Sequence, residues 1–407
     1  MKKTLALLLA LVMVFALSVS GVSASAEEPV TLTYWYWADN TEQSACMQEA
    51  VAAFNESNGK GITVVAEEYP WDSGGYIETV FNAVMGGGGP DITCFKVSGG
   101  KLFNASGLLN DMTSYVEGWE DAGQISDAAW DIMRAATEDG TIKVLPISLE
   151  PLYVYYRPSM FAAAGVEVPT TVEEFLKVCE ALTGDGHYGY GLRGANGGHE
   201  HLGNFLYAYG ASWDDLTTPE AVEAYNAYLS IFTNGWAPED AVNTAYNELV
   251  DQFRTGTVGM IIHHIGSSNT WLQEFGDDVS AFVFPGSDKG RWTCTGDTEM
   301  AVLSNCKDVD AAWEFYKFMT VGEGGTIWFK GTGKGLGTEN VTSTEEFATN
   351  RFQAVSAEAM QYAGVLPPTE TLSEFTGTVW TPTNQQALLE QITPEEALET
   401  MNAALHG

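Results

Sequence analysis

VTLTYWYW, at residues 30–37, is the stretch of sequence that decides the fold class. Its β-branched and aromatic residues predict a β-strand. The segments after it predict a helix over 41–57, a strand over 62–66, a helix over 76–85 and a strand over 90–93. Strands that alternate with helices in this order form a parallel sheet with helical crossovers, so we expect an α/β fold.

The residues before this strand have the layout of a secretory signal peptide. Lys2 and Lys3 form a basic start, residues 5–19 are almost wholly apolar, and residues 24–26 (ASA) provide a small-residue cleavage site. The apolar segment is shorter than the ~20 residues of a membrane span. We therefore expect cleavage after Ala26 and an exported protein that is periplasmic, extracellular or at the cell surface; a membrane anchor is the alternative.

The composition restricts the possible partners. The chain has 54 acidic and 18 basic residues and a formal net charge of −36, and such a negative field repels nucleic acid and anionic lipid. Hydrophobic residues make up 45% of the 407-residue chain, which is enough for a sizeable core and suggests two domains. We expect a monomer that binds no nucleic acid.

The five cysteines indicate neither a metal site nor a redox motif. They form no CxxC pair, and no cluster of His and Cys has zinc spacing. We therefore expect no metal and no cofactor. Buried thiols are the expected state of the cysteines, with a Cys294–Cys306 disulfide as the alternative.

Helix-start signals divide the rest of the chain. Thr171 followed by Glu174 predicts a capping box, and the pairs Thr218-Pro219 and Thr393-Pro394 predict helices that begin at proline. Residues 310–319 are so apolar that we expect a buried helix there. The chain has no fixed-period repeat and no long linker, so we expect it to cross more than once between interleaved domains.

Four stretches of the chain resemble extracellular solute-binding protein family 1, the sugar-binding components of bacterial ABC importers. They are YWYW at 34–37 with the helix after it; GPDI at 89–92; the run of LP at 145–146, LYVYYR at 152–157, MFAAAG at 160–165 and PTTVEEF at 169–175; and FRTGTVGM at 253–260, followed by Gly266 and AAWEFYKF at 311–318. They span nearly the whole chain after the signal peptide, in the family's order.

The sequence departs from the family's pattern in two places. Val172 stands where relatives usually carry tryptophan, a position that we interpret as structural. Residues 17–21 (LSVSG) lack the lipid-modified cysteine that many Gram-positive relatives carry after the signal peptide. The second departure puts lipid anchoring in doubt.

The resemblance implies a two-lobed α/β fold like that of periplasmic binding proteins, with interleaved lobes and a hinge of crossover strands. With a signal peptide at 1–26, the implied lobes are 27–145 with 264–325, and 146–263 with 326–407. The implied function is to capture a carbohydrate, which we expect to be an oligosaccharide, in the cleft between the lobes. Hinge closure would then let the protein deliver it to the permease subunits of an ABC importer, without catalysis.

The ends of the first two predicted strands supply the first candidate ligand-binding residues. A sugar site combines aromatic rings, which stack on the sugar, with polar groups that bind its hydroxyls, and ligands of parallel sheets collect beyond the carboxyl ends of strands. This rule selects Trp37, Asp39 and Asn40 after the first strand, and Glu68, Trp71 and Asp72 after the second. Core packing of the tryptophans beside a solvated acidic turn is the alternative.

Other loops add further candidates. The loop at 196–201 is polar and glycine-rich, and its histidines lack the i, i+4 spacing of zinc proteases. By resemblance, a crossover with ligand contacts lies near Gly266, and a segment that holds ligand in relatives lies at 295–299. The further candidates are Asn196, His199, Glu200, Trp213, His264, Trp271, Asp297, Glu299, Trp328 and Trp380. A surface loop and core tryptophans are the alternatives.

Two other functions remain open at this point. The same fold could bind a polyamine or another small polar solute, and salt would then weaken binding, unlike the binding of a sugar. A secreted glycoside hydrolase would need two carboxylates across a glycosidic bond, but with 54 acidic residues some pair is always eligible. The chain contains no nucleophile elbow, HExxH or phosphate-loop motif, so we expect no enzyme.

Overall fold

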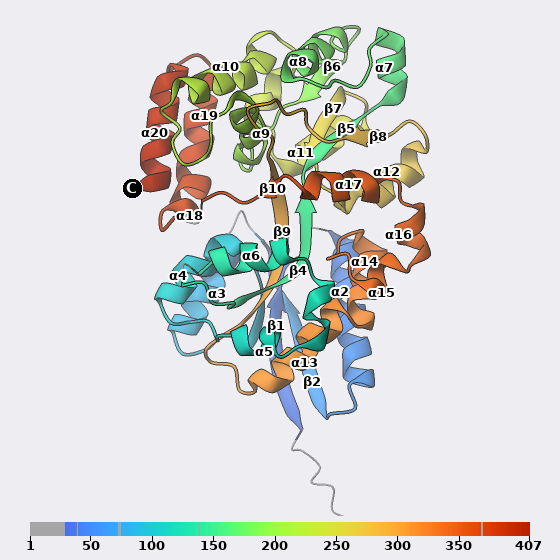
Figure 1. Ribbon diagram of the computed structural model, residues 1–407, viewed down its shortest axis with the longest axis vertical. Coiled ribbons are helices and arrows are strands. Elements are labelled where there is room, and N and C mark those ends of the chain that lie inside the picture. Colours follow the sequence, from blue (N-terminus) through green and yellow to red (C-terminus); the bar gives the residue numbers. More distant parts are fainter. Residues whose placement is uncertain (1–28, 39, 72–74, 138, 368) are drawn as a thin grey trace, which may run out of the picture.

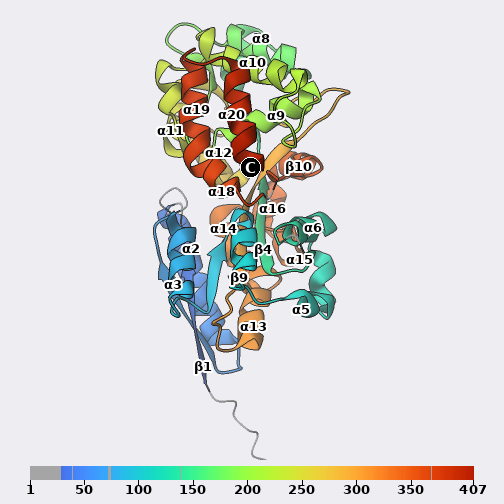
Figure 2. The ribbon, with the colours of Figure 1, turned by 90° about the vertical axis from the view of Figure 1, so that its left-hand side faces the viewer.

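The computed structural model describes residues 29–38, 40–71, 75–137, 139–367 and 369–407. Two lobes lie one above the other along the long axis of the molecule, and each is built around a β-sheet with helices packed on it (Figure 1). The same two-lobed shape is seen after a 90° turn (Figure 2). We call the lower lobe of Figure 1 lobe 1 and the upper lobe lobe 2.

The strands of lobe 1 belong to a six-stranded sheet in the order β10-β9-β3-β1-β2, with β4 paired to β9, and the short strand β10 at its edge comes from the segment that follows α17 (Phe352–Met360). The strands are β1 (Val30–Tyr36), β2 (Ile62–Glu68), β3 (Ile92–Phe95), β4 (Val144–Pro151), β9 (Thr293–Val302) and β10 (Ala363–Gly364). β1 is parallel to β2 and β3, as the sequence predicts. β9 differs because it runs antiparallel to both β3 and β4.

Aromatic residues attach the helices of lobe 1 to this sheet. Alternate side chains of β1 are buried, and the ring of Tyr34 lies 5.4 Å from that of Phe315, which in turn lies 5.1 Å from the ring of Phe54. The helices of this lobe are α2 (Thr41–Ser57), α3 (Gly75–Met85), α4 (Gly100–Ala105), α5 (Thr113–Glu117), α6 (Asp127–Ala135), α13 (Val309–Thr320), α14 (Glu323–Thr332), α15 (Glu339–Thr342) and α16 (Glu345–Thr349). The apolar helix predicted over 310–319 is α13, and it is largely buried.

Asp91, in the GPDI motif, joins three segments of lobe 1. Its carboxylate is buried and accepts hydrogen bonds from the backbone N–H and the hydroxyl of Thr33, each at 2.8 Å. It also accepts a hydrogen bond from the backbone N–H of Lys307 at 3.0 Å. A buried carboxylate needs such donors, so the motif has a structural role in this chain.

Lobe 2 is built on a four-stranded sheet in the order β6-β7-β5-β8. Its strands are β5 (Tyr153–Tyr156), β6 (Tyr188–Gly191), β7 (Val258–His263) and β8 (Ser280–Phe282). Its helices are α7 (Pro158–Ala164), α8 (Val172–Ala181), α9 (His199–Tyr209), α10 (Pro219–Thr233), α11 (Tyr246–Arg254), α12 (Ser268–Phe275), α17 (Phe352–Met360), α18 (Leu372–Glu374), α19 (Trp380–Leu388) and α20 (Pro394–His406).

The chain passes between the lobes at three places, so the lobes are interleaved as predicted. β4 continues into β5 through Leu152, β8 is followed by β9, and α16 is followed by α17. The lobe boundaries themselves remain a proposal. Because β8 pairs with β5, α14 packs on α2 and Asn350 binds Ser268, we propose 27–151 with 293–349 for lobe 1, and 152–292 with 350–407 for lobe 2.

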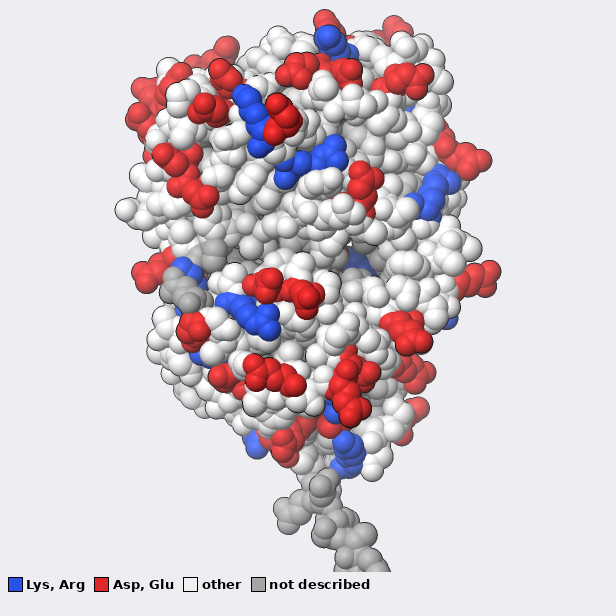
Figure 3. All heavy atoms as spheres, viewed as in Figure 1, with Lys and Arg blue, Asp and Glu red and all other residues white. Residues whose placement is uncertain are grey.

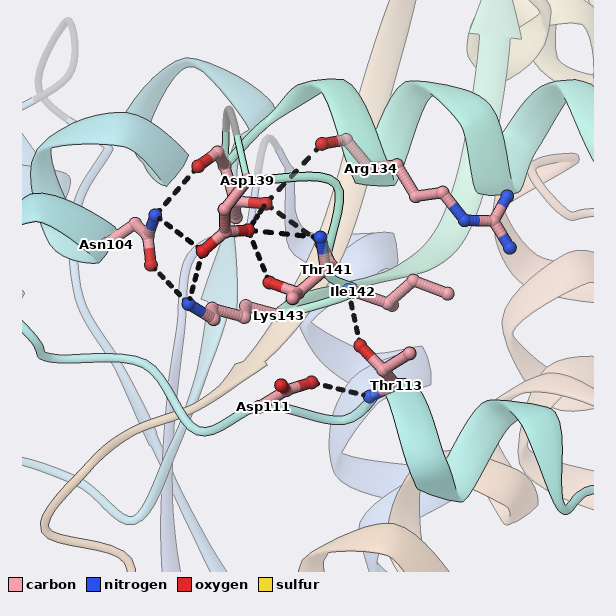
Figure 4. A network of polar contacts seen from close by, with 9 residues as sticks. Asn104, Asp111, Thr113, Arg134, Asp139, Thr141, Ile142 and Lys143 are labelled. Atoms are coloured by element: carbon pink, nitrogen blue, oxygen red, sulfur yellow. Dashed lines mark hydrogen bonds and ion pairs between the residues drawn. The ribbon is translucent and has the colours of Figure 1, made fainter.

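A polar network fixes the turn that leads into β4 (Figure 4). The Asp139 carboxylate accepts hydrogen bonds from the backbone N–H of Thr141 at 3.0 Å and the hydroxyl of Thr137 at 3.2 Å, and pairs with the Lys143 ammonium at 2.9 Å. These contacts, led by the hydrogen bond from the Thr141 hydroxyl, hold the pKa of the Asp139 carboxyl well below its usual range. The strand that leads to lobe 2 therefore has a fixed start.

The predicted helix starts are found, with one difference in detail. Thr393 and Glu396 form a complete capping box at the start of α20. Thr171 caps α8 by accepting from the N–H of Glu174, but the Glu174 carboxylate accepts from Thr170 instead of closing the box on Thr171. The reciprocal half of that capping box is therefore shifted by one residue.

The cysteines and the described helices bear on two further expectations. None of the five cysteines forms a disulfide, so the Cys294–Cys306 alternative is wrong. Cys94, Cys179 and Cys294 are buried, whereas Cys46 and Cys306 are half-buried.

Among the helices that the structure describes, none is long and apolar enough to cross a membrane.

Candidate ligand-binding cleft

A cleft lies between the lobes, and its wall on lobe 1 is formed at the ends of three parallel strands. Trp37 follows β1, Trp71 follows β2 and Lys96 follows β3, and all three line the cleft. The two indole rings lie 4.7 Å apart, and the Lys96 ammonium lies 5.6 Å from the centre of the Trp37 ring. Trp37 is 4% exposed and Trp71 is half-buried, so Trp71 offers more ring surface to a ligand.

The wall at the hinge carries a buried ion pair. Glu150, near the end of β4, is 3% exposed and accepts a hydrogen bond from the Ser148 hydroxyl at 2.6 Å. Its other carboxylate oxygen lies 3.3 Å from the Lys334 ammonium and 3.8 Å from Nδ1 of His264. Glu150 therefore connects the crossover strand, the segment after α14 and the end of β7.

The wall on lobe 2 carries a second ion pair. Nη1 of Arg193 donates a hydrogen bond to Glu200 at 3.0 Å, and the guanidinium lies 5.7 Å from the centre of the Tyr246 ring. The guanidinium packs against the backbone of Gly197, where a Cβ atom would come within 2.0 Å of it. Gly197 also has a φ of +83°, which favours glycine, so this loop sets the position of Arg193.

Tyr246 and His264 form a stacked, hydrogen-bonded pair. The Tyr246 hydroxyl lies 3.0 Å from Nε2 of His264, and the Gly266 N–H donates to Nδ1 at 2.9 Å. Because Nδ1 accepts, we assign the imidazole proton to Nε2, which donates to the tyrosine. Burial, followed by the nearby His263 and Lys334, lowers the pKa of His264 well below its usual value, so the ring is neutral at pH 7.

The cleft continues into a second, more polar hollow on the far side of this pair. Tyr246, His264 and Lys334 line both hollows. The second hollow is otherwise lined by Asn40, Glu42, Gln43, Gly266, Ser267, Asn269, Thr270, Gly331 and Thr332. The two hollows therefore share part of one wall.

The structure brings five of the predicted site residues together at the cleft. Trp37, Trp71, Glu200 and His264 line the first hollow, the one with Lys96, Glu150 and Arg193 in its walls, which we call the inner hollow; Asn40 lines the polar one. Asn40 also caps α2 by accepting a hydrogen bond from the backbone of Gln43. Asp39 and Asp72 lie outside the described residues.

Four other predicted residues, Glu68, Asn196, His199 and Glu299, line neither hollow, and the side chain of a fifth, Asp297, lies outside the described part of the chain. Glu68 accepts a hydrogen bond from the Tyr36 hydroxyl at 3.2 Å and another from Ser44, both within lobe 1. Asn196 is half-buried in its loop, and Glu299 is fully buried in β9. His199 packs against Phe375 and Trp380, and burial together with Arg193 lowers its pKa to about 3. The backbone of Asp297 pairs with Leu149, which places it within β9.

Four of the predicted tryptophans are buried in the lobes, each at 2% exposure or less. They are Trp213, Trp271, Trp328 and Trp380. Trp213 packs near Trp292, Trp271 near Tyr155, and the Trp380 indole N–H donates to the backbone of Ala195. We leave these four residues out of the proposed site because their rings are enclosed by other side chains.

Among the cleft residues that sequence reasoning missed are five charged or polar ones, namely Lys96, Glu150, Arg193, Tyr246 and Lys334. Lys96 and Arg193 directly follow β3 and β6, so the strand-end rule could have selected them. The other three carry no such signal. In the described part of the chain, no group of three or more His, Cys, Asp or Glu side chains is placed to hold a metal ion.

The sequence matches an established family over most of its length. The pattern described as "Bacterial extracellular solute-binding protein" covers residues 37–326. The chain belongs to this family. Among relatives of this solute-binding protein, a putative binding protein of Brucella abortus is 24% identical over 290 residues, 67% of each chain. The mannitol-binding protein of Pseudomonas aeruginosa is 28% identical over 189 residues, 42% of this chain and 41% of that protein.

Solved structures share the fold of this solute-binding protein. The GacH receptor of Streptomyces glaucescens, solved unliganded and with acarbose, matches with a TM-score of 0.80 at 19% identity, over 92% of this chain and 97% of that one. A solute-binding protein of Thermotoga lettingae bound to α-D-tagatose gives a TM-score of 0.77 at 22% identity, over 92% and 100%. The predicted two-lobed fold is thereby confirmed, and both the family and the fold are those of binding proteins.

Proposed function

We propose that this solute-binding protein captures a carbohydrate in the cleft and delivers it unchanged to the permease subunits of an ABC importer. The observation that carries the proposal is the pair of indoles, Trp37 and Trp71, across one cleft from Glu200 and the Tyr246–His264 pair. Indole rings cover the apolar face of a sugar, while carboxylate, hydroxyl and imidazole groups bind its hydroxyls. We further propose that it acts outside the cytoplasmic membrane after loss of residues 1–26.

Similar proteins support a carbohydrate as the cargo. Solved structures with this fold hold tagatose, acarbose and cycloalternan, and one curated relative binds mannitol. The walls of the cleft come from both lobes, so a bound sugar would contact both and favour the closed arrangement. Closure then reports to the importer that the site is occupied.

The cleft disfavours a polyamine, the main alternative cargo. A polyamine is a polycation and needs carboxylates that are available to it. The two carboxylates of the inner hollow, among the described residues, are each paired within the protein, Glu150 with Lys334 and Glu200 with Arg193. A polyamine would have to displace a protein cation from each of them.

A thermal-shift screen of the purified protein tests the proposal. The ligands are mono- and oligosaccharides, polyamines and amino acids, and each hit is checked by calorimetric titration. A ligand at 100 times its Kd should stabilise the folded state by ~2.7 kcal/mol. Mass spectrometry should recover the bound sugar intact. A response to polyamines alone would sink the carbohydrate proposal, and cleavage of the sugar would sink the claim that the protein only binds it.

A further inference from the structure

The charges that line the inner hollow reverse the balance of the whole chain. Acidic residues outnumber basic ones by 54 to 18, and acidic side chains are spread over both lobes on the face seen in Figure 3. In the inner hollow, among the described residues, three basic side chains (Lys96, Arg193 and Lys334) stand against two acidic ones (Glu150 and Glu200). The basic residues follow β3, β6 and α14, so three separate elements bring them to one place.

The two acidic residues are held by the protein itself. Glu150 lies 3.3 Å from the Lys334 ammonium and accepts from Ser148, and Glu200 accepts from Arg193 at 3.0 Å. Each of these carboxylates is therefore offset by the cation that it pairs with, and each cation by its carboxylate. The described lining of the inner hollow is basic in balance.

Arg193, which lines the inner hollow, has one guanidinium donor without an acceptor among the described residues. Its guanidinium packs against Gly197 and lies 5.7 Å from the centre of the Tyr246 ring, and its side chain is 14% exposed. Nη1 is bound to Glu200, whereas Nε is buried and has no hydrogen-bond partner among the described residues. A buried charged donor without an acceptor is destabilising, and a carboxylate is the acceptor that a guanidinium fork fits best.

The negative charge of the rest of the surface does not cancel this local effect. At physiological ionic strength, interactions between exposed charges are largely screened beyond the Debye length of ~8 Å. Groups that line the inner hollow lie closer than this to a bound ligand and in a less polar environment. The charged residues of the inner hollow therefore weigh more than the rest of the surface in its affinity for an acidic group.

We infer that the cargo is an acidic carbohydrate, a uronic acid or an oligosaccharide that contains one. Its ring would lie against Trp71, its carboxylate would meet Arg193, and Lys96 would lie beside it on the lobe 1 wall. The inference rests on the proposed function, because it takes a carbohydrate site as given. It adds the chemical feature by which the site would select among carbohydrates.

Matched pairs of sugars test the inference by calorimetric titration at neutral pH. The pairs are galactose with galacturonate, glucose with glucuronate, and galactotriose with trigalacturonate, and spermidine is titrated in parallel. In at least one pair, the acidic member should bind about tenfold more tightly than its neutral partner, or better, because one charge-assisted contact supplies such a ratio.

Variants then locate the effect. Arg193→Gln should lower the affinity for the acidic sugar by about tenfold or more, with a smaller effect on the neutral partner. Arg193→Lys keeps the positive charge but loses the planar guanidinium. Its affinity for the acidic sugar should lie between those of the unaltered protein and Arg193→Gln. Lys177→Gln, an exposed position on α8, is the matched control and should bind like the unaltered protein. If Arg193→Gln does not fold, Lys96→Gln takes its place. It should also bind the acidic sugar less tightly than the unaltered protein does, by a smaller factor.

The possible outcomes separate this inference from the proposed function. Equal or tighter binding of the neutral member in every pair would overturn the acidic ligand and leave a carbohydrate-binding protein. Binding of spermidine with no binding of any sugar would overturn both proposals. An unchanged preference in Arg193→Gln and Lys96→Gln would overturn the assignment of the cleft's basic residues as its cause.

Discussion

The cleft and the cores of the lobes use tryptophan in different ways. Trp37 and Trp71 line the cleft, and each lies within three residues after the end of a parallel strand of lobe 1. The four enclosed tryptophans lie in or after helices, where their rings pack on neighbouring elements. The difference teaches that position at a strand end, and not ring chemistry, distinguishes a candidate binding tryptophan from a core residue in this fold.

The largest effect on stability should come from the cores. Trp213→Ala should lower the free energy of unfolding by about 3–5 kcal/mol, because it leaves a cavity where a fully buried indole packs near Trp292 and Phe375. Urea unfolding measures the change, and Trp213→Phe, which keeps a ring, should lose less. Loss of sugar binding at unchanged stability would break the comparison, because it would make Trp213 a binding residue.

Acid should weaken the core of lobe 2 through His199. Its folded-state pKa is about 3, below the ordinary 6.5, because of burial and the nearby Arg193. Between those values the unfolded chain binds more protons, so stability is lost as the pH falls below 6.5. One such histidine contributes roughly 2 kcal/mol of loss between pH 6.5 and 5.

Unfolding curves of the unaltered protein and of His199→Gln at pH 6.5 and pH 5 check this prediction. The carboxyls with lowered pKa, such as Asp278 and Glu314, stay ionised in this window and add nothing to the difference. The variant should lose less stability than the unaltered protein on acidification. Parallel losses in the two proteins would show that His199 does not titrate in this way.

Truncation in the cleft should affect binding more than stability. Trp71→Ala should weaken carbohydrate binding by roughly 1–2 kcal/mol, the usual cost of removing a contact aromatic, because its half-buried ring faces the cleft. Calorimetry gives the affinity, and Trp71→Phe should restore part of it. Trp37→Ala should lower both binding and stability, because Trp37 is 4% exposed and also packs on Tyr76. Full affinity in both alanine variants would remove the indoles from the site.

The variant with the smallest expected effect serves as a control for the other three predictions. Thr171→Ala removes the cap of α8, at the far end of lobe 2, and should cost about 1 kcal/mol of stability. It touches neither the cleft nor a large core residue, so the affinity for any ligand should stay the same. Thr171→Ser keeps the hydroxyl and serves as its control. A change in affinity on Thr171→Ala would mean that any loss of stability disturbs the cleft. The loss of affinity in Trp71→Ala would then have to be compared with the loss in Thr171→Ala before it is assigned to the indole ring.

Local patterns were enough to predict the first half of lobe 1 and one wall of the cleft. The alternation of strand and helix predicts β1, α2, β2, α3 and β3 within a few residues, because their side chains face one core. The strand-end rule then selects Trp37 and Trp71. It selects Asp39 and Asp72 as well, which lie outside the described residues.

The rest of the cleft depends on contacts that no local pattern records. Glu150 lies in an apolar strand, Tyr246 begins α11, and Lys334 follows α14, and none of these positions marks a binding residue by itself. They meet only because the chain crosses between the lobes and brings distant segments to one place. The same absence of tertiary information explains why Trp271 and Trp328 were predicted as binding residues together with Trp71. Every tryptophan has the same ring and indole N–H, and the sequence does not show which rings are enclosed.

The position of β9 has a consequence for the order in which the chain folds. β9 lies between β3 and β4 in the sheet of lobe 1, yet it consists of residues 293–302. Until that segment has been synthesised, β3 lacks its partner on one side, and β4 has no strand to pair with in that sheet. Contacts so distant along the chain form slowly, because the intervening loop must first close. Lobe 1 should therefore stay unfinished until about three quarters of the chain exists, which would suit a chain that, as proposed above, crosses a membrane before it folds.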